Sequence, residues 1–233
     1  MFRRRRRDEP ATPDDDFAVE EEELGQEEPA TAQPTALAGP WDAADAPADE
    51  VARLDLGALQ VPVYEDIEIR VEVGTESEVV SATLVYDGGA LQLNAFAAPR
   101  REGLWSEVRA EIAVSVGQAG GSSEEAAGPF GSELHAQVPG EAPGQGVQPA
   151  RFLGVDGPRW FLRGVITGPS ATDPERAARL EDAFRQTVVV RGGEAMAPRD
   201  ALPLALPKEA LEAAVQEPGL DPFERGPEIT EIQ

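Results

Sequence analysis

The sequence contains no cysteine, one lysine and one histidine. Without cysteine the chain can form no disulfide, has no thiol nucleophile and offers no thiolate to a metal, which is typical of a protein of the reducing cytoplasm. A phosphate-binding loop of the Walker type needs a lysine after its glycines, whereas Lys208 lies between a proline and a glutamate. Any histidine-based metal site or catalytic triad would rest on His135 alone. We therefore expect no cofactor and no metal site.

The sequence also lacks a long apolar run. Arg3 to Arg7 resemble the charged start of a signal peptide, but acidic residues come next and no apolar stretch of the required length follows. We therefore expect a cytoplasmic protein that spans no membrane. The arginine run is expected to be neutralised by the acidic residues beside it, and the alternative is that it attaches the chain to an anionic surface.

Positive charge is scarce, because 20 basic residues stand against 44 acidic ones and the net charge is -24. Residues 8–50 hold 15 acidic residues and no basic one, with many prolines and alanines. Such a segment cannot bury enough apolar surface to offset the entropy that a chain loses on folding. The composition therefore predicts a disordered tail over 1–50, one folded domain over 51–207, and a short helix with a frayed acidic tail over 208–233.

The first half of the predicted domain contains three strand signals and one helix signal. Apolar and charged residues alternate over 67–73, and the runs 79–86 and 90–96 are joined by an Asp-Gly-Gly turn, which predicts a hairpin. Residues 102–119 carry an apolar stripe at helical spacing and end before two glycines. The stripe consists of Leu104, Trp105, Val108, Ile112 and Val116.

The second half contains an unbroken succession of elements between 149 and 192. Alternation predicts a strand over 132–138, and the Asp-Gly-Pro triplet at 156–158 predicts a hairpin of strands 150–155 and 159–167. The segment 172–175 offers a capping side chain and a proline for the first turn of a helix, and 187–191 form a short strand. Residues 198–207 are expected to form an extended closing arm. The order βββα-βββα-β predicts an α+β fold, with two helices packed against an antiparallel sheet.

The register of the second hairpin decides which of its residues share a face. If Asp156 pairs with Arg159, the face toward the core carries Leu153, Val155, Trp160, Leu162 and Ile166, and Leu180 and Phe184 complete this core. The opposite face then carries Phe152, Arg159, Phe161 and Arg163, with Val165. Guanidinium groups beside aromatic rings suit stacking and the recognition of anions, so these four are the candidate binding residues. The alternative is that another segment covers this face and acidic residues pair with its arginines.

No motif identifies a catalytic residue. The sequence has no Gly-x-Ser-x-Gly elbow, and its Gly-Gln-Gly triplet at 144–146 precedes no helix start. Glu133 and His135 share a strand face and are the one acid/base pair that the pattern suggests, but such a pair on an exposed strand is more typical of solvent-facing positions. We therefore assign no catalytic residue, although an enzyme that uses carboxylates alone stays open.

Four short motifs resemble an uncharacterised actinobacterial family, a domain of unknown function. They are Asp55-Leu56-Gly57, Ala98-Pro99-Arg100, Gly128-Pro129-Phe130-Gly131 and the stretch DGPRWFLRG at 156–164. The resemblance covers residues 51–207, and it extends to the arginine run and the acidic tail. It implies no activity and no catalytic residue. It also implies a gene neighbourhood with a dUTPase and an OB-fold protein, which points to nucleotide or nucleic-acid metabolism.

These observations favour a non-catalytic adaptor or regulatory module that binds a partner protein through the sheet face or the tails. The predicted element order is similar to that of secretion-chaperone-like proteins, which bind other proteins. The alternative is an accessory protein that binds nucleic acid or a nucleotide with Phe152, Arg159, Phe161 and Arg163. Charge favours the adaptor, because even the predicted domain carries a net charge of -9 and repels phosphate groups.

Overall fold

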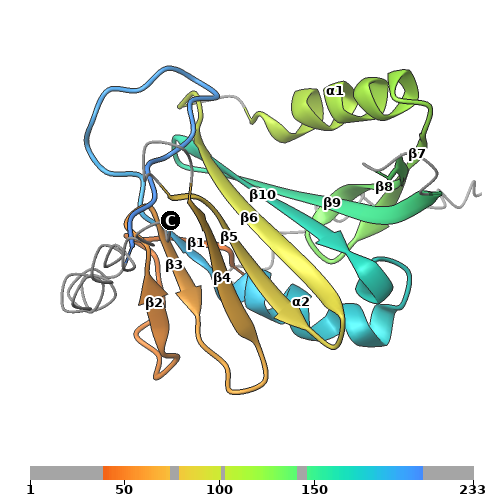
Figure 1. The fold of residues 1–233 in the computed structure, drawn as a ribbon. Coiled ribbons are helices and arrows are strands. Elements are labelled where there is room, and N and C mark those ends of the chain that lie inside the picture. Colours follow the sequence, from red (N-terminus) through yellow and green to blue (C-terminus); the bar gives the residue numbers. More distant parts are fainter. Residues whose placement is uncertain (1–38, 74–78, 101–102, 141–145, 207–233) are drawn as a thin grey trace, which may run out of the picture. The chain divides into compact units, whose positions relative to one another are not determined.

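The larger sheet has seven antiparallel strands in the order β4-β5-β6-β10-β9-β8-β7 (Figure 1). They are β4 (Glu68–Val73), β5 (Val79–Tyr86), β6 (Gly89–Ala97), β7 (Ser122–Gly128), β8 (Gly131–Pro139), β9 (Val147–Gly157) and β10 (Trp160–Thr167). The structure, a computed structural model, describes residues 39–73, 79–100, 103–140 and 146–206, which all belong to the unit Leu37–Gln233. Strands β6 and β10 lie side by side in the middle, so they join the two halves of the chain.

Strand β6 shows how the sequence specifies the sheet. Every second residue of β6 is buried, and the residues between them face the other side. The turn into β6 places Asp87 at φ 45° and Gly88 at φ 76°, in the left-handed region that tight hairpin turns require. Strand β10 pairs with β6 on one side and β9 on the other, and most of its residues are buried. The DGPRWFLRG stretch therefore lies in the middle of the sheet.

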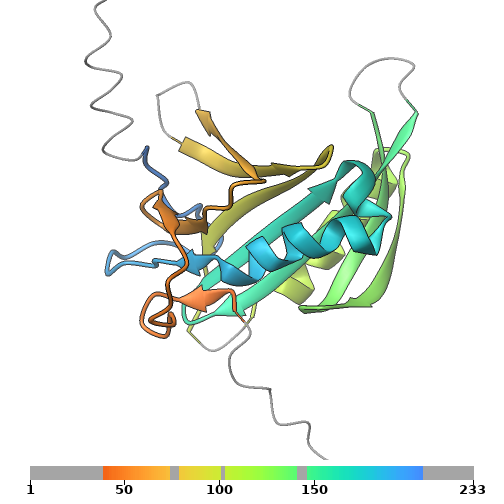
Figure 2. The same cartoon turned by 90° about the horizontal axis from the view of Figure 1, so that it is seen from below.

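The two helices pack on opposite faces of this sheet (Figure 2). Helix α1 (Trp105–Gln118) covers β7, β8 and β9, whereas α2 (Pro174–Gln186) follows the short turn η1 (Gly168–Ala171) and covers β5, β6 and β10. Asp173 caps α2, because its side chain accepts the backbone N–H groups of Glu175 and Arg176. In the ranges that the structure describes, no helix is long and apolar enough to cross a membrane.

The main core lies between the sheet and α2. The predicted core residues Leu153, Trp160, Leu162, Leu180 and Phe184 all belong to this one cluster, which confirms that part of the sequence analysis. Each of these five side chains is at most 1% exposed. The arrangement follows from the alternation along β10, because neighbouring residues of a strand point to opposite faces.

A smaller sheet closes one end of the core. It has the order β1-β11-β3-β2 and consists of β1 (Trp41–Asp42), β2 (Arg53–Asp55), β3 (Leu59–Pro62) and β11 (Val188–Val189). Strand β1 lies ahead of residue 51, where the predicted domain begins, so sequence reasoning missed this strand. The Trp160 indole donates a hydrogen bond to Asp42 at 2.7 Å and ties β1 to β10.

The C-terminal arm takes the place of β5 beside the second half of β6. Pairing between β5 and β6 ends at Leu93, and Ala201 of the arm forms a β-bridge with Phe96. The backbone N–H of Leu202 donates to the carbonyl of Ala95 at 2.9 Å. Leu204 continues into the main core and forms a β-bridge with Gly57. Residues 199–202 of the arm predicted over 198–207 therefore pair with the large sheet.

The α+β class with mostly antiparallel sheets and two helices is confirmed, and the one parallel pair is β1 with β11 in the described structure. The predicted order βββα-βββα-β omits β7 and the strands ahead of β4. The predicted pairing of Asp156 with Arg159 is wrong, because Asp156 pairs with Phe161 and the turn consists of Pro158 and Arg159, with Arg159 at φ 64°. The shift is two residues, so the face assignments are unchanged. The predicted C-terminal helix and residues 1–38 of the predicted tail lie outside the described residues.

Candidate functional site

The start of α1 is anchored to the hairpin formed by β9 and β10. Asp156 accepts the backbone N–H of Leu104 at 2.7 Å and that of Trp105 at 3.2 Å, which satisfies groups that a helix start leaves unpaired. The Trp105 indole donates to the carbonyl of Ser132 on β8 at 2.6 Å. Gly154 lies beneath this indole, and a Cβ atom there would collide with the ring. These contacts hold the first turn of α1 close to the sheet.

A row of stacked aromatic rings runs from β6 through β10 to α1. The ring centroids of Phe96 and Phe161 are 6.0 Å apart, and those of Phe161 and Trp105 are 5.8 Å apart, with interplanar angles of 21° and 20°. An arginine lies at each end of the row. The Arg163 guanidinium is 5.4 Å from the Phe96 centroid, and that of Arg109 is 5.6 Å from the Trp105 ring. Both distances are typical of cation–π contacts.

The two arginines differ in their partners. Arg109 forms an ion pair with Glu125 on β7 at 3.1 Å. Arg163 donates from Nη2 to the side-chain oxygen of Asn94 at 3.0 Å, and within the described residues it forms no ion pair. Its Nε atom is buried and has no hydrogen-bond partner there. Burial therefore lowers the pKa of Arg163 below the usual arginine value, because no nearby carboxylate offsets the loss of hydration.

A cleft of about 140 Å³ opens beside the Arg163 end of the row. It is lined by Phe96, Leu104, Val108, Glu111, Phe161, Arg163 and Arg199. Apolar and aromatic side chains from α1, β6 and β10 form most of its surface, and Arg163 is the one cation among them that has no carboxylate partner in the described structure. We call this the Arg163 cleft.

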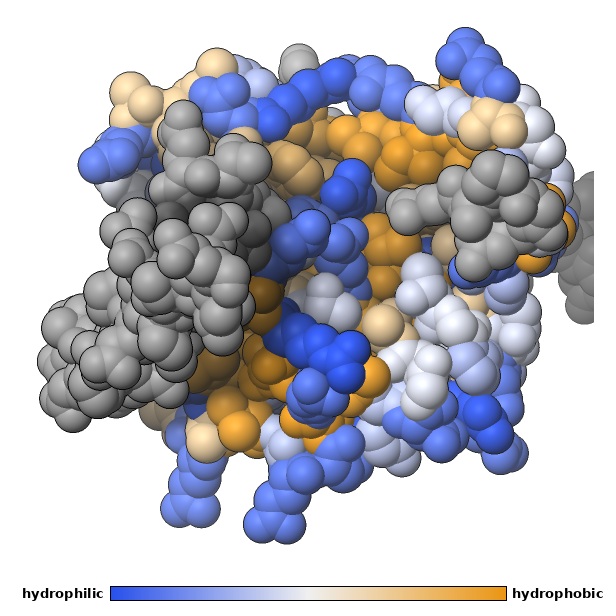
Figure 3. All heavy atoms as spheres, viewed as in Figure 1, coloured by the Kyte–Doolittle hydropathy of each residue, from blue (hydrophilic) through white to orange (hydrophobic). Residues whose placement is uncertain are grey.

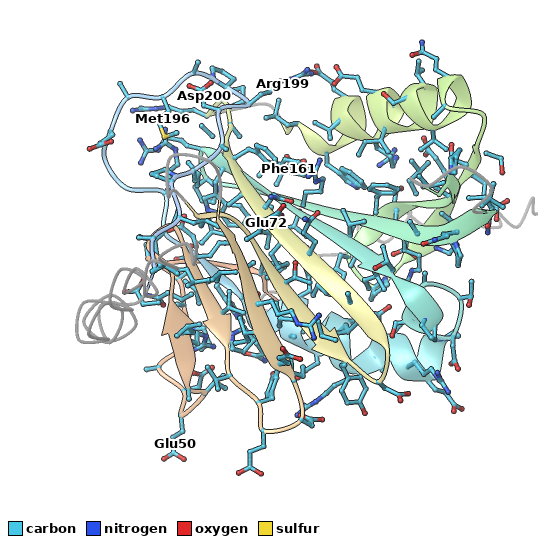
Figure 4. All side chains as sticks on the ribbon, viewed as in Figure 1. Glu50, Glu72, Phe161, Met196, Arg199 and Asp200 are labelled. Carbon is cyan, nitrogen blue, oxygen red and sulfur yellow. The ribbon has the colours of Figure 1, made fainter. Side chains whose placement is uncertain are left out.

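The sheet face next to the Arg163 cleft is polar. Ser81 on β5 donates to Glu72 on β4 at 2.9 Å, and Gln92 on β6 donates to Ser81 at 3.4 Å. In Figure 3 the middle of this face is hydrophilic, and hydrophobic atoms lie between it and α1. Figure 4 shows Phe161 and Glu72 on this face, with Arg199 above them in the view. The Arg163 cleft therefore combines an apolar pocket with a polar surround.

Arg199 joins the C-terminal arm to α1 at the edge of the Arg163 cleft. Its guanidinium pairs with Glu111 at 2.9 Å and with Glu107 at 2.9 Å. The three side chains are about half exposed, so the contact holds the arm to the helix weakly. The backbone N–H of Arg199 also donates to the carbonyl of Ala97 at 2.8 Å. The arm thus forms one side of the cleft.

The structure separates the four residues predicted to form a binding face. Phe161 is 1% exposed beneath α1, Phe152 is half-buried against the same aromatic cluster, and Arg163 reaches the cleft. Arg159 lies in the hairpin turn and donates to the carbonyl of Gly192 at 3.3 Å. Phe152, Phe161 and Arg163 therefore share one face of the sheet, and α1 packs over the two phenylalanines. Arg159 belongs to a different surface.

Sequence reasoning missed Phe96, Asn94 and Arg199 as members of this site. In the pairing of β6 with β10, Phe96 lies opposite Phe161 and Asn94 lies opposite Arg163. That pairing joins segments far apart in the chain, and no local pattern specifies it. Asn94 does carry a signal, because it and Gln92 are the two polar residues of β6 and both stand at non-core positions.

Comparison with known proteins gives a family but no function. Residues 39–213 match the model of a family described as protein of unknown function, DUF3710. The chain belongs to the DUF3710 family. No curated protein and no solved structure matches it. The match begins ahead of β1 and extends beyond the arm, so every described element of the DUF3710 domain falls within it.

The predicted pair of Glu133 and His135 lies on the opposite face of the DUF3710 sheet, in a buried ion-pair network. The interpretation of Glu133 as solvent-facing is wrong, because its side chain is 5% exposed and pairs with Arg151 at 3.0 Å. Arg151 also pairs with Glu181 of α2 at 2.8 Å, and His135 contacts Glu133 at 2.6 Å. Arg151 lies on the neighbouring strand β9, and the alternation along β8 alone does not reveal this partner.

This network explains the electrostatics of Arg151. Burial lowers the pKa of Arg151, but hydrogen bonds and attraction from Glu133 and Glu181 outweigh the burial, so its pKa lies above the usual arginine value. A second cleft, of about 550 Å³, is lined by His135 and Arg151 and lies beside the start of α2. In the described ranges, no group of three or more histidine, aspartate or glutamate side chains is placed to hold a metal ion. The network ties α2 to β8 and β9.

Proposed function

We propose that this DUF3710 protein is a non-catalytic cytoplasmic adaptor that binds a segment of a partner protein in the Arg163 cleft. One observation carries the proposal: the stack of Trp105, Phe161 and Phe96 ends at an arginine that lies in an open cleft. The energetically dominant parts of protein interfaces are enriched in aromatic residues and arginine and have a polar rim. The cleft has this composition, with Glu111 and Arg199 at its edge.

The nucleic-acid alternative has weaker support. Base stacking needs exposed rings, and Phe161 is 1% exposed beneath α1. Phosphate binding needs unpaired cations, and among the described residues eight arginines pair with carboxylates. These are Arg53, Arg70, Arg109, Arg151, Arg176, Arg179, Arg185 and Arg199. With a net charge of -24 the chain also repels phosphate at long range, so a protein ligand is favoured.

The test compares two substitutions on α1. Val108→Glu fills the cleft with a charged side chain, and Val114→Glu makes the same change at a position that is 59% exposed on the same helix. Wild type and both variants are used to capture proteins from native cell extract, and each captured protein is then purified and its affinity measured. We expect a direct partner that loses at least tenfold in affinity with Val108→Glu and keeps its affinity with Val114→Glu.

Two results contradict the proposal. One is a purified partner whose affinity does not respond to Val108→Glu although both variants melt like wild type. The other is binding of RNA or single-stranded DNA that weakens steeply with salt and is lost in an Arg159→Ala, Arg163→Ala double variant, because such salt dependence indicates phosphate contacts. That outcome would establish the nucleic-acid alternative.

A further inference from the structure

The partly buried guanidinium of Arg163 has no carboxylate partner among the described residues. Burial of a guanidinium is unfavourable unless an opposite charge or hydrogen-bond acceptors replace the lost water. Arg109, at the other end of the same aromatic row, has Glu125 for this purpose. Arg163 has the amide oxygen of Asn94 and the face of Phe96. No described carboxylate completes the Arg163 site, although the chain contains 44 acidic residues.

The donors of Arg163 suit a ligand inside the cleft. A guanidinium has five N–H groups in a planar fork that fits a carboxylate with two hydrogen bonds. Asn94 uses Nη2, and Nε is buried without a partner in the described structure. Because Arg163 lines the cleft, an acceptor placed there can bond to the terminal N–H groups that Asn94 leaves, while the buried Nε–H reports the added charge.

The rest of the cleft specifies what accompanies the acceptor. Leu104, Val108 and the two phenylalanine rings offer apolar surface next to the guanidinium. A volume of about 140 Å³ is well below the range of roughly 300 to 1,000 Å³ that is typical of sites for drug-sized ligands. The cleft is therefore too small to enclose a nucleotide, whereas one apolar side chain with an adjacent small anion fits inside it.

We propose that the Arg163 cleft binds a carboxylate of the partner together with the apolar side chain next to it. The carboxylate belongs either to the C-terminus of the partner, after a residue such as leucine, or to an aspartate that follows such a residue. A carboxylate is favoured over a phosphate because one guanidinium balances a single negative charge, and Glu111 also lines the cleft and repels a second one. This inference rests on the proposed function, since it names the chemistry that the same cleft recognises.

The experiment titrates the full-length protein with small probes and follows the NMR signal of the Arg163 Nε–H group, which is assigned by its disappearance in Arg163→Gln. The probes are N-acetyl-leucine, N-acetyl-leucyl-aspartate α-amide, N-acetyl-leucinamide and inorganic phosphate. We expect a saturable shift with one or both carboxylates, and an affinity for the leucinamide that is lower by about tenfold or more, as for the loss of a charge-assisted pair. The responding carboxylate distinguishes a C-terminal from an internal acid.

Matched variants show whether the response belongs to this site. Arg70→Gln, on the same sheet face, removes an exposed arginine that is already paired with Glu68, and it should leave the titration unchanged. Arg163→Gln should abolish binding of the carboxylate probes, followed through neighbouring backbone amides. The inference fails if the leucinamide binds as well as N-acetyl-leucine, if Arg163→Gln binds as wild type does, if phosphate alone responds, or if no probe binds at the highest soluble concentration.

The two proposals can fail separately. If a purified partner loses affinity for Val108→Glu but binds Arg163→Gln as it binds wild type, the adaptor function is supported and carboxylate recognition is contradicted. If the affinity of the partner changes with neither variant, both proposals are contradicted.

Discussion

The carboxylate of Asp156 accepts the backbone N–H of Leu104 at 2.7 Å, across a sequence separation of 52 residues. It therefore acts as the cap of α1 from another element of the fold, since Leu104 has no capping side chain of its own. We expect Asp156→Ala to destabilise the domain by about 1 to 2 kcal/mol, the usual loss for a helix cap. Urea unfolding measures this. Asp156→Asn keeps an acceptor and should lose less, and equal losses for the two variants would contradict the assigned role.

Gly154→Ala should move α1 away from the sheet. The added Cβ atom has no room beneath the Trp105 ring, and overpacking of this kind costs about 1 to 3 kcal/mol. The control is Gly117→Ala on the exposed side of the same helix, where a Cβ meets nothing within 4 Å. That change should stabilise the domain by about 0.5 to 1 kcal/mol, because alanine favours a helix over glycine. Opposite shifts in melting temperature confirm the contact, and parallel shifts refute it.

Glu133→Gln should destabilise the domain strongly. It removes one of the two carboxylates that balance buried Arg151, and breaking a buried ion pair costs about 3 to 5 kcal/mol. Because Glu181 remains, we expect the free energy of unfolding, measured with urea, to fall by about 3 kcal/mol. Glu125→Gln breaks the pair with Arg109 at a carboxylate that is 59% exposed, so its effect should stay below about 1 kcal/mol. Similar values for the two variants would show that Glu133 is not held as described.

Tyr64 should make the domain lose stability in alkali. Burial and the hydrogen bond to Asp182 at 2.7 Å raise the pKa of the Tyr64 hydroxyl from its ordinary value of 10.0 to about 12. The folded state therefore holds the proton more tightly than the unfolded state, so the stabilisation is complete below pH 10 and is lost as the pH rises toward 12. Tyr64→Phe should flatten this part of the pH profile of unfolding. An identical profile in wild type and variant would contradict it.

Removal of residues 1–50 should destabilise the domain, whereas removal of residues 1–38 should not. The longer deletion takes away β1 and leaves the Trp160 indole without its acceptor Asp42. A buried donor without a partner costs about 1 to 3 kcal/mol. Asp42→Ala in the full chain should reproduce much of the loss. Equal melting temperatures for both deletions would place the N-terminal limit of the fold at residue 51.

The predictable parts of the fold are those with a local pattern. The alternation along β6, the Asp-Gly-Gly turn and the cap and proline at the start of α2 each act within a few residues, and the structure contains all three elements. Strand β7 has the sequence SSEEAAG and no apolar alternation, because it is an edge strand with mostly exposed side chains. Strand β7 forms because it pairs with β8, so its own sequence contains no local pattern that predicts a strand.

The candidate site was predictable only where it lies on one element. Phe161 and Arg163 share a face of β10, and the period of a strand is enough to show this. Phe96, Leu104 and Arg199 come from three other segments, and the site exists because β6, α1 and the arm meet at β10. The same limit explains Glu133, whose ion pair with Arg151 joins two strands across a sequence separation of 18 residues.

The arm that completes the Arg163 cleft follows every strand of the large sheet in the chain. During synthesis, β6, α1 and β10 leave the ribosome well before Arg199 and Leu202, which pair with the second half of β6. Until the arm is in place, the second half of β6 has unpaired backbone groups on the side that the arm later covers. Such an exposed strand edge can pair with a strand of another chain. Pairing of the arm with β6 therefore completes the Arg163 cleft and covers this open edge in one and the same folding step.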